Sequence, residues 1–124
     1  MKILALDYGS ARTGVAVSDA TGTLARPLGV VERAGTGAGF DRLRELIESE
    51  AAQRVVVGLP LTLRGERGAQ ADETESFVER LREVVSVPVE LYDERFTSVL
   101  ADGDDARAAA HLLTSYLEWS RGRA

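Results

Sequence analysis

The hydrophobic pattern of this chain changes its period near residue 40, and that change constrains the fold more than any other feature. Before it, three segments rich in strand-forming residues follow one another across short turns, at residues 2–8, 13–18 and 24–31. Strands joined by short turns pair antiparallel, so these segments predict an antiparallel meander. The glycine-rich stretch 34–39 predicts the loop that closes this β-rich part.

Beyond residue 40, helical and strand patterns alternate. Phe40, Leu43 and Ile47 recur at helical spacing, and similar amphipathic patterns cover residues 70–85 and 104–119. Between these helices, two short apolar segments predict further strands, at residues 54–58 and 88–92. The order β-β-β-α-β-α-β-α predicts an α/β fold, and the lack of a long linker predicts one domain over residues 1–124.

Composition excludes several kinds of site and partner. The 124 residues contain no cysteine and only one histidine, His111, so disulfides and thiolate sites are excluded and a zinc site is disfavoured. Any metal would be a hard cation bound by carboxylates. No run approaches the roughly 20 apolar residues that cross a bilayer, and no secretory signal precedes the first strand, so we expect a cytoplasmic protein. The net charge of −5 argues against non-specific coating of nucleic acid.

Acidic residues stand where predicted elements begin or end. Asp7 closes the first strand, Asp93 and Glu94 follow the fifth, and Asp105 begins the last helix. Ligands of sheets covered by helices gather beyond strand ends and at helix N-termini. Carboxylates that meet there repel one another unless a cation or a proton intervenes. These acids therefore form a candidate Mg²⁺ or Mn²⁺ site.

Each acid also has a purely structural interpretation. Asp7 is suited to a turn that its side chain stabilises, and Asp104 or Asp105 could cap the last helix. Asp93 and Glu94 could be a solvated charge pair at the end of a strand. Taken one at a time, none of these positions requires a metal.

Periodicity separates some of these candidates. Asp105 shares a helix face with Ala109 and Leu112, which must meet the sheet, whereas Asp104 lies on another face. Side chains alternate along a strand, so only one of Asp93 and Glu94 can point toward a site near Asp7. The pattern alone does not decide which.

The segment that follows the fourth strand, "LTLRGERG", is rich in glycine and arginine. It is either a flexible surface connection or a segment whose backbone N–H groups and guanidinium groups, from Arg64 and Arg67, contact phosphates.

Four segments together resemble one protein family. "LALDYGSARTGVAVSD", "VVVGLPLTLRGERGAQA", "VPVELYDERFTS" and "DDARAAAHLLTSYLE" are similar, in this order, to the YqgF (RuvX) family of RNase H-like nucleases, described as pre-16S rRNA nucleases and as Holliday-junction-resolvase-like proteins. The resemblance covers nearly the whole chain. It implies an RNase H-like fold, a mixed five-stranded sheet whose first three strands are antiparallel, flanked by helices.

The resemblance also implies metal-dependent cleavage of phosphodiesters in structured nucleic acid, most directly in 5′-end processing of precursor 16S rRNA. It implies one or two Mg²⁺ or Mn²⁺ ions held by catalytic residues Asp7, Glu94 and Asp105. Asp93 is the alternate ligand from the fifth strand. The resemblance leaves open whether such a protein is a monomer or a homodimer.

Arginines supply the expected contacts to substrate phosphates. The family likeness and the loop pattern together assign this role to the arginines that follow the first, fourth and fifth strands: Arg12, Arg64, Arg67 and Arg95. The chain departs from the family in having Ala11 before Arg12, where a lysine or a similar residue is usual. It also departs in the stretch 97–104, which is shorter than the glycine- and lysine-bearing segment of typical members.

Other functions fit parts of the same pattern. A resolvase would act on branched DNA, and a non-catalytic module would bind RNA or a processing partner through the same surface. "DYGSARTGVAVSD" also resembles the first phosphate-binding segment of actin-like and sugar-kinase ATPases. Those ATPases need a second phosphate loop and a much longer chain, which this sequence lacks.

Overall fold

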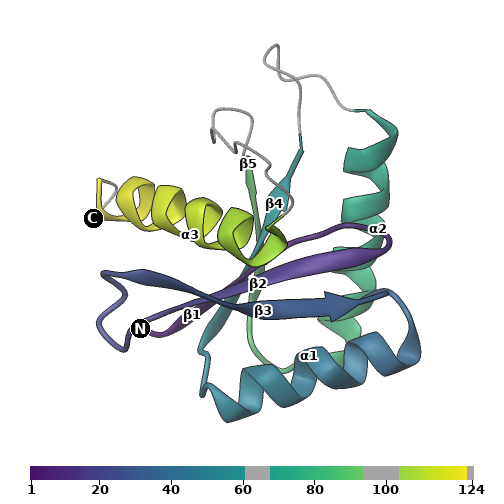
Figure 1. The fold of residues 1–124 in the computed structure, drawn as a ribbon, viewed down its shortest axis with the longest axis horizontal. Helices are drawn as coiled ribbons and strands as arrows, with labels where there is room; N and C mark the ends of the chain where they lie inside the picture. The colour runs from purple at the N-terminus through teal and green to yellow at the C-terminus, as the bar shows by residue number, and fades with distance from the viewer. Residues whose placement is uncertain (61–67, 94–103, 123–124) are drawn as a thin grey trace.

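The computed structural model describes residues 1–60, 68–93 and 104–122, and one mixed sheet runs through them (Figure 1). The strands follow the order β3-β2-β1-β4-β5 across the sheet. Their bounds are β1 Ile3–Asp7, β2 Arg12–Ser18, β3 Ala25–Glu32, β4 Arg54–Leu59 and β5 Val89–Asp93. The helices are α1 Gly37–Ser49, α2 Ala69–Val84 and α3 Asp105–Arg121.

The pairing of the strands confirms the expected mixed sheet. β1 pairs antiparallel with β2, and β2 antiparallel with β3, whereas β1, β4 and β5 run parallel to one another. Parallel strands end at the same edge of a sheet. Asp7, Leu59 and Asp93 therefore lie along one edge, and the candidate acids of β1 and β5 share it.

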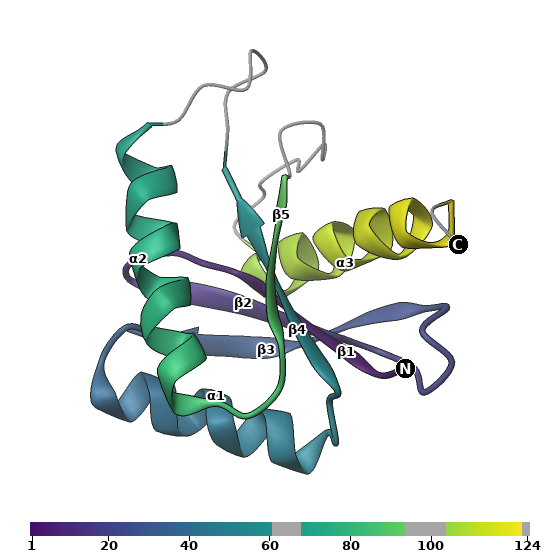
Figure 2. The same ribbon diagram turned by 180° about the vertical axis from the view of Figure 1, so that it is seen from behind.

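Helices cover both faces of the sheet (Figures 1 and 2). On one face, Leu4 and Leu6 of β1 join a buried cluster with Leu43 of α1 and Phe77 of α2. On the other face, buried side chains of the sheet pack against α3: Ile3, Ala5, Ala16 and Val56. The alternation of side chains along β1 thus assigns its odd-numbered residues to the α3 face.

Helix α1 begins inside the stretch 34–39 that the sequence predicted as a loop. Thr36 is its N-cap, and the Thr36 hydroxyl accepts a hydrogen bond from the Gly39 backbone N–H at 3.2 Å. Gly39 packs so closely on the backbone of Arg33 and Ala34 that a Cβ atom would clash with it. The prediction was wrong for Gly37–Gly39, because capping and close packing outweigh the low helix propensity of glycine.

The face predicted for helix α3 is confirmed. Asp104 is the N-cap, and its carboxylate accepts a hydrogen bond from the Arg107 N–H at 3.0 Å. The side chains on the face of Asp105 are buried against the sheet: Ala109, Leu112, Leu113 and Tyr116. The capping interpretation therefore belongs to Asp104, which leaves the carboxylate of Asp105 available at the edge of the core.

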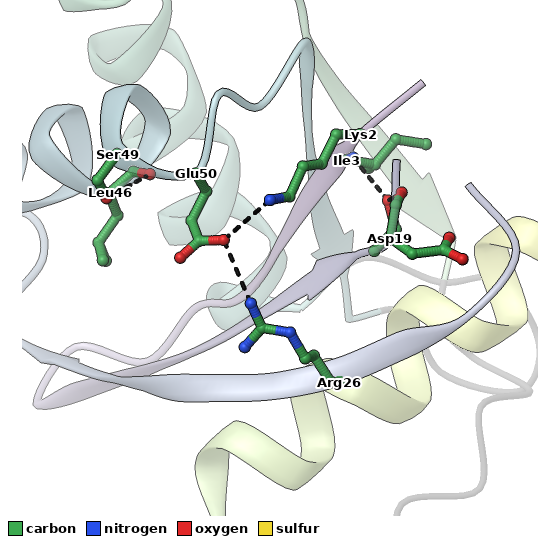
Figure 3. Close-up of polar contacts among 8 residues, drawn as sticks. Lys2, Ile3, Asp19, Arg26, Leu46, Ser49 and Glu50 are labelled. Atoms are coloured by element: carbon green, nitrogen blue, oxygen red, sulfur yellow. Dashed lines mark hydrogen bonds and ion pairs between the residues drawn. The ribbon is translucent and has the colours of Figure 1, made fainter. Parts of the chain in front are cut away.

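Polar contacts connect the start of β1 to its neighbours (Figure 3). Glu50, at the C-cap of α1, forms ion pairs with Lys2 at 3.1 Å and with Arg26 of β3 at 3.4 Å. The backbone N–H of Ile3 donates to the Ser18 hydroxyl at 2.8 Å. Partly exposed pairs of this kind contribute at most about 1 kcal/mol each, so burial of the two cores dominates the stability. No helix in the described residues combines the length and apolarity of a transmembrane span.

Candidate functional site

Asp7 ends β1 on the face of the sheet that α3 covers. Ile3 and Ala5, two and four residues earlier, pack against α3, and alternation places Asp7 on the same side. In the pairing of β1 with β2, Asp7 lies opposite Gly14. Regular pairing of β1 with β2 thus fixes the backbone of Asp7 beside the turn that joins the two strands.

Gly14 explains how the start of α3 comes so close to this strand pair. A Cβ atom at residue 14 would collide with the backbone carbonyl group of Asp105. Only glycine leaves space for the first turn of α3 at this point of β2. A glycine inside a strand is a signal of close backbone approach, so the role of Gly14 could have been predicted from its place in the β-rich segment 13–18.

Electrostatics reflects the proximity of Asp7 and Asp105. The pKa of Asp7 is raised above its ordinary value of 3.8, first by burial and second by the negative charge of Asp105. Two carboxylates in a partly buried site repel each other until a proton or a cation reduces the charge. The pair is therefore suited chemically to a hard divalent cation, for which carboxylate oxygens are the preferred ligands.

Arg12 already supplies one positive charge to this pair. Its Nε lies 3.2 Å from a carboxylate oxygen of Asp105, in an ion pair whose side chains are 59% and 30% exposed. Arg12 follows the turn between β1 and β2 and begins β2 on the same face as Gly14. The arginine expected to contact phosphate thus lies beside the acids, where it can also reach solvent.

Asp93 lies on the other face of the sheet from Asp7. Val89 and Leu91 lie on the same face of β5 as Asp93, because side chains two residues apart along a strand point the same way. Both pack into the core beneath α1 and α2. Between them, Glu90 accepts a hydrogen bond from the Tyr116 hydroxyl at 3.0 Å, and Tyr92 shares one with Ser115 of α3 at 2.7 Å. The even-numbered side chains of β5 thus face α3, and Asp93 does not.

Four expected site residues lie outside the described residues: Glu94, Arg64, Arg67 and Arg95. In the ranges 1–60, 68–93 and 104–122, no three acidic, histidine or cysteine side chains are arranged to hold a metal ion. Those ranges bring together one pair of the predicted acids, Asp7 with Asp105. His111 is exposed on α3.

Comparison with known proteins identifies relatives along nearly the whole chain. Residues 1–119 match the family model of RuvX, described as Holliday junction resolvase. A protein of Chloroflexus aurantiacus named "Putative pre-16S rRNA nuclease" is 46% identical over 100 residues. That match covers 81% of this chain and 65% of the relative, so the chain spans less than two thirds of that relative's length.

A second relative matches over more of both chains. The protein of the same name from Desulforudis audaxviator is 39% identical over 132 aligned residues, covering 94% of each chain. The aligned length exceeds the 124 residues of this chain, so the relative has residues without a counterpart here.

The solved structures confirm the RNase H-like fold. RuvC of T. thermophilus, in a complex with a Holliday junction substrate, superposes with a TM-score of 0.64. The match covers 98% of this chain and 96% of that chain at 19% identity. At that identity, the likeness establishes the arrangement of strands and helices and nothing about the residues of the site.

Proposed function

The chain belongs to the RuvX family, and on this basis we propose that it is a divalent-metal-dependent nuclease that cleaves phosphodiesters in structured nucleic acid. The observation that carries the proposal is the approach of Asp7 and Asp105 at the edge where β1, β4 and β5 end. A partly buried acidic pair is unfavourable for folding, because burial and repulsion both oppose ionisation. A bound cation would offset this repulsion between the two carboxylates.

A divalent metal is the cofactor that fits these residues. Asp7 and Asp105 would hold it, and in the proposed enzyme the third ligand is Glu94. When bound, such a metal would supply activation of the attacking water and neutralisation of charge on the leaving oxygen. Arg12, which pairs with Asp105 and has a side chain that is 59% exposed, would contact a substrate phosphate.

The alternation of β5 supports Glu94 over Asp93 as that third ligand. Glu90 and Tyr92 face α3, whereas Leu91 and Asp93 lie on the opposite face. If the strand pattern continues by one residue, Glu94 comes to the α3 face, where Asp7 lies. The side chain of Asp93 could reach the same place only if the backbone twisted locally and turned that side chain to the other face of the sheet.

We propose that the substrate is precursor 16S rRNA and that the protein acts in the cytoplasm. The names of the relatives from C. aurantiacus and D. audaxviator support an RNA substrate. The family description favours a second candidate, a four-way DNA junction. A junction resolvase must cut two strands and therefore needs two active sites, so a strict monomer in solution would count against that role.

The test is a cleavage assay with purified protein and Mn²⁺ on two substrates, an RNA with a 5′-extended 16S end and a four-way DNA junction. We expect cleavage of the RNA, and we expect Asp7→Asn and Asp105→Asn to reduce it by at least ~100-fold, since removal of one metal ligand disables the site. Asp41→Asn is the matched control, because Asp41 is an exposed acid of α1 that pairs with Arg44. Cleavage that persists in both site variants would refute the proposal, and binding without cleavage would identify a non-catalytic module.

A further inference from the structure

A basic hollow lies beside the turn between β1 and β2, on the face opposite to the acidic pair. Its volume is about 460 Å³, and its polar lining comes from Tyr8, Ser10, Arg33, Thr36 and Arg80. We propose that this hollow binds a backbone phosphate of the nucleic-acid substrate, at a nucleotide outside the cleaved bond. This inference rests on the proposed function, because it assigns a second contact to the same substrate.

Packing fixes Arg80 at the wall of the hollow. Its Nη1 donates a hydrogen bond to the carbonyl oxygen of Gly35 at 3.1 Å, and its guanidinium lies 5.4 Å from the ring centroid of Phe40. Phe40 stacks on Phe77, which in turn stacks on Tyr8 with ring centroids 4.4 Å apart. A guanidinium held in this way loses little freedom when it binds an anion.

The lack of a side chain at Gly35 keeps the hollow open. A Cβ atom there would lie 3.0 Å from an Nη atom of Arg80 and 3.7 Å from the hydroxyl of Tyr8. Any larger side chain at this position would occupy the space in front of both groups. Gly35 therefore leaves the guanidinium of Arg80 accessible from the side of the hollow.

Arg33 supplies the second guanidinium. Its backbone has a φ of 47°, an uncommon left-handed conformation for a residue with a side chain, and its N–H donates to the carbonyl oxygen of Ala11 at 2.9 Å. This bond ties the end of β3 to the turn between β1 and β2. The Arg33 side chain is exposed, and no carboxylate of the described residues forms an ion pair with it.

The charge balance favours an anion. Two guanidiniums line the hollow, and no carboxylate of the described residues is part of the lining. Glu73 accepts a hydrogen bond from the Tyr8 hydroxyl at 3.2 Å from outside the lining. In a chain of net charge −5, this is a local concentration of positive charge. Guanidinium forks suit the oxygens of a phosphate.

The position of the hollow fits a strand of nucleic acid that crosses the edge of the sheet. Asp7 and Tyr8 are consecutive, and their side chains lie on opposite faces at the end of β1: Asp7 toward α3, and Tyr8 toward Phe77 of α2. A nucleic-acid strand whose cleaved phosphodiester lies near Asp7 would continue over this edge of the sheet toward Arg33. The hollow would then set the orientation of the substrate and take no part in the chemistry.

The salt dependence of binding tests this inference. RNA with the 5′-extended 16S end is titrated in the cleavage-deficient Asp7→Asn background, by fluorescence anisotropy, between about 50 and 200 mM salt. We expect Arg33→Gln and Arg80→Gln each to weaken binding about tenfold. Each should also reduce the slope of log K against log salt by about 0.7–0.9, the contribution of one lost phosphate contact.

Arg121→Gln is the matched control, since it removes the same charge from the last turn of α3. That end of α3 lies on the other side of the molecule from the turn between β1 and β2 (Figure 1). Arg33→Lys should recover most of the salt slope, because a point charge still attracts phosphate.

Thermal melting verifies that Arg80→Gln remains folded, and the Nε–Hε signal of Arg33 in NMR spectra should shift on addition of RNA. Equal slopes for Arg33→Gln and Arg121→Gln would overturn the subsite while leaving the cleavage assay of the proposed function intact. Failure of the protein to bind RNA or DNA at all would overturn both.

Discussion

The first turn of α3 lies directly against Gly14 of β2, with no space between that residue and the Asp105 carbonyl group for even a methyl group. Gly14 is also the partner of Asp7 in the pairing of β1 with β2. One glycine therefore determines both how closely α3 docks and how near the two acids come to each other.

Gly14→Ala should separate these acids. The added methyl group must push the start of α3 away from β2, and overpacking of this kind costs about 1–3 kcal/mol in the free energy of unfolding. We expect a loss of nuclease activity larger than the loss of folded protein at the assay temperature. Chemical denaturation and cleavage rates measured on the same preparation check this. Gly29→Ala is the control, because a Cβ atom at Gly29 of β3 meets no atom within 4 Å, and we expect it to be neutral or slightly stabilising.

Asp7→Asn should make the protein more stable at neutral pH while it abolishes cleavage. Because the pKa of Asp7 is higher in the folded state than its ordinary value of 3.8, the ionised side chain disfavours folding. That penalty is absent below pH 3.8, grows as the pH rises from 3.8 toward the folded-state pKa, and is complete above that pKa. The gain in melting temperature should therefore be present at pH 7 and vanish toward pH 3.8. A variant that is less stable than the parent at pH 7 would contradict this explanation.

Mn²⁺ should raise the melting temperature of the parent protein. A ligand that binds only the folded state adds about 2.7 kcal/mol of stability when its concentration is 100 times its dissociation constant. Asp105→Asn should remove most of this effect, whereas Asp41→Asn should retain it. Differential scanning fluorimetry across a Mn²⁺ titration gives the comparison, and equal stabilisation of all three proteins would exclude Asp105 as a ligand.

Asp19→Ala should destabilise the turn between β2 and β3 in a pH-dependent way. One carboxylate oxygen of Asp19 accepts hydrogen bonds from the backbone N–H groups of Thr23, at 2.8 Å, and Leu24, at 3.2 Å. These bonds, the one to Thr23 first, hold the pKa of Asp19 below its usual value of 3.8. The carboxylate therefore contributes stability above pH 3.8 that is lost as the pH falls through the lower, folded-state pKa. The difference in melting temperature between parent and variant should shrink from pH 7 to pH 2.5, and a constant difference would show that the charge has no part in it.

Most of the elements could be predicted from the sequence, because each carries its own periodic pattern. The continuous apolar runs of β1 and β4, and the helical spacing of Leu112 and Tyr116 in α3, reflect burial that is decided within a few residues of chain. The start of α1 could not be predicted, since the helix at Gly37 depends on the Thr36 cap and on packing against Arg33. Those contacts involve atoms that local propensity does not describe.

The candidate site divides in the same way. The acids that end the strands, and the face of α3 that carries Asp105, could be read from the chain alone, because strand and helix periodicity fix the direction of a side chain relative to its own element. The packing of the elements was needed to show that Asp7 lies near Asp105, that Arg12 pairs with Asp105, and that Asp93 faces away. These relationships depend on the strand order β3-β2-β1-β4-β5 and on the space left by Gly14, and so on contacts between residues that are far apart in the chain.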